Sequence, residues 1–258
     1  MKVTILGCGP SSGVPLVTGN WGDCNPDNPK NFRSRPSIVI EQDGFRVLID
    51  TSPDLRMQLL RNNINTIDAV LYTHDHADHV MGIDDLRGIW RQRGALIDVF
   101  GPADVLQSLK KRFGYLFKDV QDPFDLYKPI LNPHNLDGPF SVGPFEPVVP
   151  FEQDHGICAS WGFRFGKFAY STDVVDLSEE ALDTLDGVDT WVVDCLRNGP
   201  PHPTHANLET TLSWVRRLGV RHAILTHMNF QSDYDAMAEA CPDGVEPAYD
   251  GMVLELES

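Results

Sequence analysis

Three histidines and two aspartates occupy the six positions from His74 to His79, within the stretch LYTHDHADHVMG. Neither residue type favours the interior of a helix or a strand, so local propensity does not account for the cluster. Imidazole nitrogens and carboxylate oxygens are ligands for zinc, manganese and iron. On an extended segment His74 and His76 point to the same side, and Asp78 and His79 follow where the chain is expected to turn. The cluster therefore predicts a metal site that can offer one pair of ligands to each of two ions.

The elements that would position such a site are strands with polar ends. Several apolar runs that we interpret as buried strands carry or lead into a polar side chain: DAVLYT (68–73) into His74, KFAYST (167–172) into Asp173, TWVVDC (190–195) with Asp194, and HAILT (222–226) into His227. Ligands of open α/β folds collect at the ends of strands, so we expect these side chains to converge.

Strand and helix patterns alternate along the chain. SIVIEQDGFRVLID (37–50) predicts a hairpin with its turn at Asp43-Gly44. Ser52-Pro53 predicts the start of a helix that runs to about Arg61. Residues 114–145 are rich in proline and stay unassigned, as a candidate lid or dimer surface. With no repeat and no linker, we expect a single α/β domain over 1–258, built as a layered sandwich of mixed sheets.

The composition excludes several classes of function. The formal net charge is −16, and the one local basic cluster, Lys110 to Arg112, has the spacing of a solvated helix face, which argues against long nucleic acid as a partner. No apolar run approaches the ~20 residues of a membrane span, and the first residues, MKVTILGCGP, read as a strand. Five scattered cysteines indicate a reduced, cytoplasmic protein without a disulfide framework.

The pattern H-x-H-x-D-H after an apolar strand resembles the signature of the metallo-β-lactamase superfamily. The resemblance implies a four-layer αβ/βα sandwich of two mixed β-sheets flanked by helices, and a site for two divalent ions, zinc or manganese. It also implies three further ligands: His155 in FEQDHG, Asp173 in YSTD and His227 in ILTHMN. On this basis His74, His76 and His155 are assigned to one ion, Asp78, His79 and His227 to the other, and Asp173 to both.

Within that superfamily, the stretches GCGPSSGVP, NFRSRPSIVI and HADHVMGIDDLR resemble the phosphodiesterase branch, and most of all the enzymes that open phosphoribosyl 1,2-cyclic phosphate. This likeness implies hydrolysis of a small, cyclic ribose or nucleotide phosphodiester by a metal-bridging hydroxide. His205 and Asp78 are the implied catalytic residues, with His205 protonating the leaving alkoxide. Cys24 stands alone, and Phe230 occupies the position of a histidine, where those enzymes hold a structural zinc, so we expect none here.

Three other functions stay open: a thioester or lactone hydrolase on the same fold, a transfer-RNA 3′-processing nuclease, and a non-catalytic nucleotide-binding protein. The nuclease usually carries a basic, Gly- and Pro-rich arm that this chain lacks. The complete ligand set argues against a non-catalytic protein. We expect a small anionic phosphodiester or nucleotide as the partner, no membrane, and a homodimer as one possible assembly.

Weaker candidates surround the predicted ligands. Asp50 in VLIDTSPD would either orient a ligand histidine or cap a helix, and Asp75 would lie behind the ligands or in solvent. Arg33 and Arg35 would either hold a phosphate or pair at the surface. Ser11 and Ser12 would line the pocket from a Gly-rich turn. We interpret a separate set of histidines as structural or surface residues: His134, His202 and His222.

Overall fold

The computed structural model describes residues 1–118 and 128–256, which form two compact units. The first unit comprises Met1–Leu6, Ser37–Asp137 and Val253–Ser258, and the second comprises Gly7–Pro36 and Gly138–Met252. Each unit contains one mixed sheet flanked by helices, which confirms the predicted α/β class. That the chain acts as one domain over 1–258 stays a prediction.

The sheet of the first unit has seven strands in the order β14-β1-β2-β3-β4-β5-β6. Their bounds are β1 (Lys2–Gly7), β2 (Ser37–Gln42), β3 (Phe45–Ile49), β4 (Ala69–Leu71), β5 (Ile97–Gly101), β6 (Leu131–Asn135) and β14 (Val253–Glu255). Strands β2 and β3 form the predicted hairpin, whereas β3, β4, β5 and β6 run parallel. Parallel strands end at the same edge, so the residues after β3 and β4 become neighbours.

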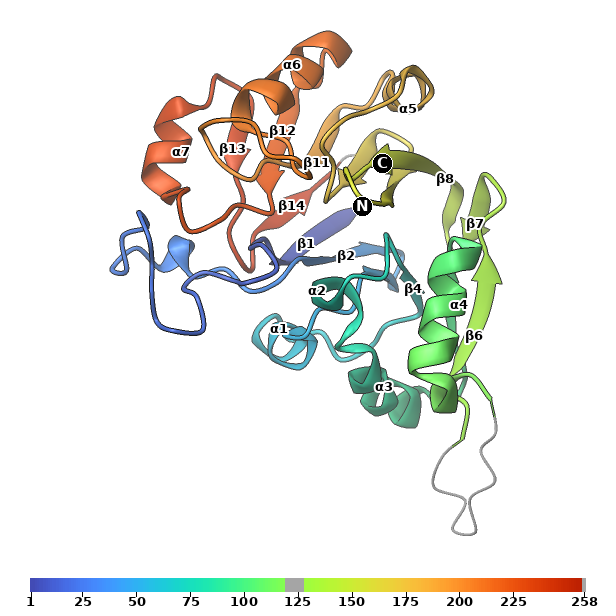
Figure 1. Ribbon diagram of the computed structural model, residues 1–258. Coiled ribbons are helices and arrows are strands. Elements are labelled where there is room, and N and C mark those ends of the chain that lie inside the picture. The colour runs from blue at the N-terminus through green and yellow to red at the C-terminus, as the bar shows by residue number, and fades with distance from the viewer. Residues whose placement is uncertain (119–127, 257–258) are drawn as a thin grey trace. The chain divides into compact units, whose positions relative to one another are not determined.

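The helices of the first unit lie beside its sheet (Figure 1). Apolar side chains of these helices and of the strands form one buried core. The helices are α1 (Leu55–Arg61), α2 (Ala77–Val80), α3 (Leu86–Arg93), α4 (Ala103–Arg112) and the short 3-10 turns Ile83–Asp85 and Gly114–Leu116. The helix predicted from Pro53 begins at Leu55 instead. Ser52 Oγ accepts a hydrogen bond from the backbone N–H of Asp54 at 3.0 Å, so Ser52 closes a turn that precedes the helix.

The sheet of the second unit has the order β13-β12-β11-β10-β9-β8-β7. Its strands are β7 (Phe140–Val142), β8 (Phe145–Asp154), β9 (Ala159–Phe165), β10 (Phe168–Ser171), β11 (Thr190–Asp194), β12 (His222–Thr226) and β13 (Val245–Pro247). Strands β10 to β13 are parallel, while β9 is antiparallel to both β8 and β10. The chain therefore leaves β8, β10, β11 and β12 at one edge of the sheet.

The helices of the second unit are α5 (Glu179–Leu185), α6 (Leu208–Leu218) and α7 (Tyr234–Ala240), with a 3-10 turn at Pro29–Asn31 (Figure 1). Asn207 caps α6, since its side chain accepts from the N–H of Thr210 at 3.0 Å. In the unassigned stretch 114–145 the described residues include β6 and β7, whereas residues 119–127 lie outside the described part, as does any lid they would form. No helix among the described residues has the length and apolar character needed to cross a membrane.

Candidate active site

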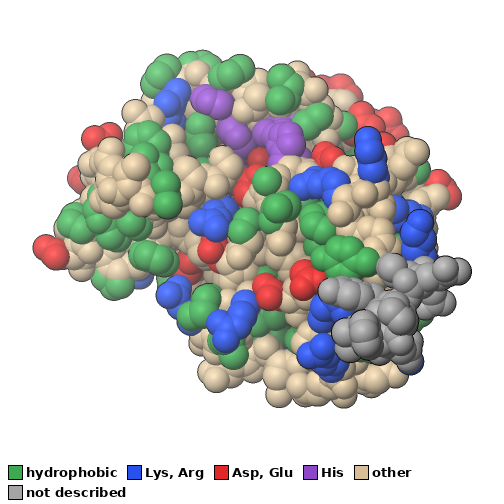
Figure 2. Space-filling view, turned by 60° about the horizontal axis from the view of Figure 1, so that its bottom comes forward, with side chains coloured by type: hydrophobic (Ala, Val, Ile, Leu, Met, Phe, Trp, Pro, Cys, Tyr) green, Lys and Arg blue, Asp and Glu red, His purple; other side chains and the backbone are tan. Residues whose placement is uncertain are grey.

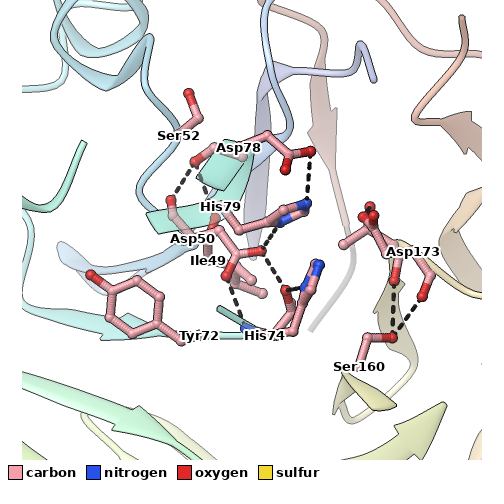
Figure 3. Close-up of polar contacts among 12 residues, drawn as sticks. Ile49, Asp50, Ser52, Tyr72, His74, Asp78, His79, Ser160 and Asp173 are labelled. Carbon is pink, nitrogen blue, oxygen red and sulfur yellow. Dashed lines mark hydrogen bonds and ion pairs between the residues drawn. The ribbon is translucent and has the colours of Figure 1, made fainter. Parts of the chain in front are cut away.

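Asp50 organises the histidine-rich loop of the first unit. It follows β3, and because Ile49 pairs with Leu71 of β4, Asp50 lies beside the residues that follow β4. Its Oδ1 accepts from the backbone N–H of Thr73 at 2.9 Å, and its Oδ2 accepts from Thr73 Oγ1 and from His79 Nδ1, both at 2.7 Å (Figure 3). Burial raises the pKa of this carboxyl, and its contacts with His79 and Thr73 oppose that shift.

These bonds fix which ring nitrogen carries the proton in two predicted ligands. His79 donates from Nδ1 to Asp50, so Nε2 of its neutral ring keeps the lone pair. Thr73 Oγ1 gives its proton to Asp50 and therefore accepts from His74 Nδ1 at 3.0 Å, which also leaves the lone pair on His74 Nε2. One carboxylate thus orients the rings of both predicted ligands, His79 directly and His74 through Thr73, and it caps none of the described helices.

The spacing of the donor atoms in this loop suits metal ions. Asp78 Oδ2 lies 3.3 Å from His79 Nε2, and candidate ligand atoms of His74 and His76 lie within 4.8 Å of each other. Two ligand atoms that share a tetrahedral zinc at about 2.0–2.1 Å lie roughly 3.4 Å apart. The residues of the first unit therefore fit the predicted group in both their donor types and their spacing.

Asp173 lies between two histidines of the second unit. Its Oδ1 is 3.5 Å from His155 Nε2, and its Oδ2 is 3.4 Å from His227 Nε2. One carboxylate oxygen thus faces each ring, which is the arrangement that a carboxylate shared by two ions requires. His155 donates from Nδ1 to the carbonyl oxygen of Thr204 at 2.7 Å, so its lone pair is on Nε2. Ser160 Oγ holds the backbone carbonyl of Asp173 at 2.7 Å (Figure 3).

His205 and Asp194 form a second ordered pair in the same unit. Asp194 ends β11, is fully buried, and accepts from His205 Nδ1 at 2.8 Å and from the N–H of Val174 at 2.9 Å, both through Oδ2. The His205 ring is stacked on that of His227, with centroids 4.5 Å apart, and lies edge-on to that of His155 at 4.9 Å. Candidate ligand atoms of Asp194, His205 and His227 all lie within 4.8 Å of one another. Some histidine side chains are visible at the surface on the face drawn in Figure 2.

Three site residues have left-handed backbone conformations, which non-glycine residues seldom adopt. The φ angles are 61° at Asp50, 55° at Asp173 and 62° at His227, and each residue comes directly or shortly after a strand end. Such strain persists where the surrounding structure fixes the residue, and it concentrates at functional sites. The strained backbone positions therefore coincide with three of the strand ends that carry the predicted site residues.

The weaker candidates lie in different surroundings. Asp75 turns away from the ligands toward α4, where its Oδ2 accepts from Ser108 Oγ at 2.5 Å and its carbonyl accepts from Arg112 Nη1 at 2.7 Å. Ser11 and Ser12 are exposed in a turn, so their role in lining a pocket stays a prediction.

Arg33 requires a correction. Its side chain is buried, with Nη1 donating to the carbonyl of Asn229 at 3.2 Å and Nη2 to that of Ser232 at 2.7 Å. Neither a phosphate contact nor surface pairing fits this position. Arg33 instead ties its loop to the segment after β12, where buried carbonyls need donors. Arg35 is half-buried beside Gly13 and stays a candidate phosphate contact.

Most of the chain matches one known protein family. The family described as "Beta-lactamase superfamily domain" matches residues 45–228. The chain belongs to this superfamily. The match includes all seven predicted ligands, and the two mixed sheets with flanking helices are those of the metallo-β-lactamase fold.

Individual relatives give a finer picture. A solved structure described as a new diphosphatase from the PhnP family is 33% identical, with a TM-score of 0.89, and the match covers 99% of this chain and 98% of that one. An octanoyltransferase of Porphyromonas gingivalis is 33% identical over 98% of this chain but 51% of its own length. A ribonuclease Z of Bradyrhizobium sp. is 28% identical over 53% of this chain and 46% of its own length. The chain spans about half the length of these two curated relatives.

The sequence predicted that Asp194 lies among the converging strand-end side chains, but it assigned this residue no role in the site. Its position at a strand end was visible in TWVVDC, but a single buried acid at the end of an apolar run also suits a capping role. Its importance depends on His205, which follows eleven residues later, after a proline-rich loop whose course the sequence does not reveal.

Proposed function

We propose that the chain is a metal-dependent hydrolase that cleaves a small phosphodiester, with a cyclic ribose or nucleotide phosphodiester as the preferred substrate. The predicted ligands would hold two divalent ions, zinc or manganese: His74, His76, Asp78, His79, His155, Asp173 and His227. Such ions would supply an activated water and neutralise charge on the phosphate. The donor sets described above and the 33% identity to a PhnP-family diphosphatase support this proposal.

The hydrogen-bonded pair of His205 and Asp194 is the observation that favours phosphodiesters over carbon esters as substrates. When the bond from phosphorus to the leaving oxygen breaks, an alkoxide needs a proton because its conjugate acid is weak. A His205 imidazolium can give the proton from Nε2, while Nδ1–H stays bound to Asp194, whose buried carboxylate stabilises the positive charge. A thioester or lactone hydrolase depends less on this proton donor, since its strongest requirement is stabilisation of a carbonyl oxyanion.

The diphosphatase relative favours a second candidate substrate, a phosphoric anhydride. The attacked phosphorus is similar in both reactions, but a departing phosphate is a much better leaving group than an alkoxide and needs little protonation. The two candidates therefore differ in how strongly they depend on His205.

Leaving-group dependence tests the proposal. We would assay wild type and His205→Ala, each loaded with zinc or manganese, on 2′,3′-cyclic AMP, bis(4-nitrophenyl) phosphate, a dinucleoside diphosphate, a thioester and a lactone. We expect His205→Ala to keep its metal content and to lose about 10²–10⁴-fold in rate on the cyclic nucleotide, with a much smaller loss on the aryl ester. Wild-type turnover of the carbon esters alone would contradict the proposal, and loss of metal in the variant would make His205 a ligand.

Metal removal gives an independent test. Dialysis against a chelator should abolish hydrolysis and lower the melting temperature, and added zinc or manganese should restore both, because an ion that binds only the folded chain stabilises it. Undiminished turnover in metal-free protein would refute the metal-dependent mechanism.

A further inference from the structure

Asp75 separates two predicted metal ligands, His74 and His76, in the loop between β4 and α2. Helix α4 holds both the side chain and the backbone of this residue. Ser108 Oγ donates to Asp75 Oδ2 at 2.5 Å, and Arg112 Nη1 donates to the Asp75 carbonyl oxygen at 2.7 Å. The sequence had placed Asp75 either behind the ligands or in solvent, and had interpreted the basic end of α4 as a solvated helix face. The two contacts connect these features.

The core of the first unit fixes the face of α4 that meets the loop. Ser108 and Arg112 are four residues apart, so their side chains lie on the same face of the helix. Val105, Leu106 and Leu109 are buried in the core, which sets the rotation of α4 about its axis. The two donors are therefore held toward the loop by packing that does not involve the loop itself.

Arg112 contacts the chain on both sides of the short helix α2. In addition to its bond with Asp75, its Nη2 lies 3.4 Å from Sδ of Met81, the C-cap residue of α2. Helix α2 has four residues, among them the predicted ligands Asp78 and His79. A helix of one turn is not stable by itself, so its position depends on contacts of this kind. A planar guanidinium can hold two acceptors at a fixed separation, which a lysine ammonium does less well.

Helix α4 and Asp50 act on different parts of the loop. The bonds of Asp50 orient the ring of His79 and, through Thr73, that of His74. The bonds from α4 instead hold Asp75, whose neighbour His76 has an extended backbone with φ −63° and ψ 153°. Successive side chains of an extended segment point to opposite sides, so α4 holds the loop from the side opposite the ligand rings.

We propose that Ser108 and Arg112 are positioning residues of the metal centre. Acting through Asp75, they place His74 and His76 for the ion that these two histidines share. The proposal rests on the proposed function, which supplies the identity of the ligands. It adds α4 to the residues that determine metal affinity, and it assigns their effect mainly to one of the two ions.

The exposure of the contact sets the size of the expected effect. The side chains of Arg112 and Asp75 are 33% and 45% exposed, and Arg112 Nη1 lies 3.9 Å from Asp75 Oδ2. An ion pair of this kind contributes little in water, so the hydrogen bonds are the main part of the contact. Replacing a residue that orients a metal ligand typically weakens metal binding by about 10- to 100-fold. A half-exposed contact should lie at the lower end of that range.

Metal titration of the metal-free protein tests this role. We would measure zinc Kd values by competition with a chromophoric chelator for wild type, Ser108→Ala, Ser108→Thr and Arg112→Ala. Lys111→Ala is the matched control, because it removes a positive charge from the same turn of α4 at an exposed position. The absorption spectrum of the cobalt(II)-substituted protein reports the geometry of the ligands, and thermal melts of the metal-free variants report the stability of the fold.

We expect Ser108→Ala and Arg112→Ala each to raise one of the two zinc Kd values about tenfold and to alter the cobalt spectrum. Ser108→Thr keeps the hydroxyl and should bind zinc nearly as wild type does. In an Asp75→Ala background, replacing Ser108 should have no further effect, because Ser108 acts through the carboxylate. Replacing Arg112 in that background should still weaken binding, because the backbone carbonyl remains.

Three results would overturn the positioning role: a lower melting temperature with unchanged zinc Kd values, additive effects of Asp75→Ala and Ser108→Ala, or an equal loss of affinity in Lys111→Ala. Each of them leaves the proposed function intact. Tight zinc binding by a wild-type protein that hydrolyses no phosphodiester would refute the proposed function alone, and the Kd values would still decide the role of α4. A wild-type protein that binds no zinc, manganese or cobalt would refute both proposals.

Discussion

Asp50 in the first unit and Asp194 in the second are fully buried carboxylates that each hold the Nδ1 of a histidine, at 2.7 and 2.8 Å. Their remaining bonds differ. Asp50 also accepts twice from Thr73 and so serves two predicted ligands, His79 directly and His74 through Thr73. Asp194 serves His205, which the family signature does not use as a ligand. The same pair of groups can therefore order a metal ligand or a proton donor, and its neighbours decide which.

The largest expected effect comes from Asp194→Asn. An Asn amide that donates to His205 Nδ1 would force the proton of the neutral ring onto Nε2 and would no longer stabilise an imidazolium. We expect the rate with an alkoxide leaving group to fall by about 10²–10⁴-fold at unchanged metal content. Asp189→Asn is a matched control just before the start of β11, where the side chain pairs with Arg221 at the surface. Loss of metal in Asp194→Asn would mean that Asp194, like Asp50, supports metal binding, and would contradict its separate role beside His205.

Asp50→Ala should act on stability and metal binding instead. Removing the carboxylate leaves His79 Nδ1 and Thr73 without their buried acceptor, and each buried donor left unsatisfied costs about 1–3 kcal/mol. We expect chemical denaturation of the metal-free protein to show this loss, and metal titration to show weaker binding. Asp43→Ala is the control, because Asp43 has a similar φ of 53° in an exposed turn and reports the backbone cost alone. Equal losses of unfolding free energy in both variants would mean that the hydrogen bonds of Asp50 do not contribute to stability.

Much of this arrangement could be predicted from short-range patterns. Apolar runs located β2, β3, β4, β10, β11 and β12, and the polar residues at their ends are those that the structure places at the edges of each sheet. Local sequence also predicted the hairpin turn at Asp43-Gly44, because that dipeptide adopts left-handed conformations at low cost.

The errors and omissions depend on long-range contacts. The local sequence around Arg33 does not predict its burial, because its partners are distant in the chain. These partners are the carbonyls of Asn229 and Ser232, almost 200 residues later. Strand β6 escaped prediction because Pro133 lies within it and proline is rare inside strands, except at an edge such as the one β6 occupies. The partners of Asp194 likewise follow from the course of a loop and not from spacing.

A third buried carboxylate, Asp250, sharpens the comparison because its partners are not imidazoles. It accepts from Ser34 Oγ at 2.6 Å and from the backbone N–H groups of Ser34 and Cys8 at 2.8 and 3.1 Å. Burial raises the pKa of Asp250 from 3.8 to about 6, so the folded state binds a proton more tightly than the unfolded state. Its contribution to the free energy of unfolding therefore falls as pH rises from about 4 to about 6 and is level above that range.

The measurement for Asp250 is the difference in the free energy of unfolding between wild type and Asp250→Asn, followed from pH 4 to pH 7. We expect this difference to shift against wild type by about 2 kcal/mol over that range, since Asn resembles the protonated acid. A difference that does not vary with pH would mean that the carboxyl titrates alike in both states, as a solvated acid would.

The smallest expected effect separates backbone strain from close packing at the second unit's site. Gly156 (φ 81°) and Gly166 (φ 59°) both have left-handed backbones, but a Cβ at Gly156 would meet the Pro203 carbonyl at 2.3 Å, whereas nothing lies within 4 Å of one at Gly166. Gly166→Ala should cost about 1 kcal/mol through strain alone, and Gly156→Ala should cost about 1–2 kcal/mol more. Thermal melts of both variants measure this difference. Because the displaced segment carries Thr204 and His205, we expect Gly156→Ala alone to weaken metal binding and turnover, and equal behaviour of the two variants would show that the contact with Pro203 does not position the site.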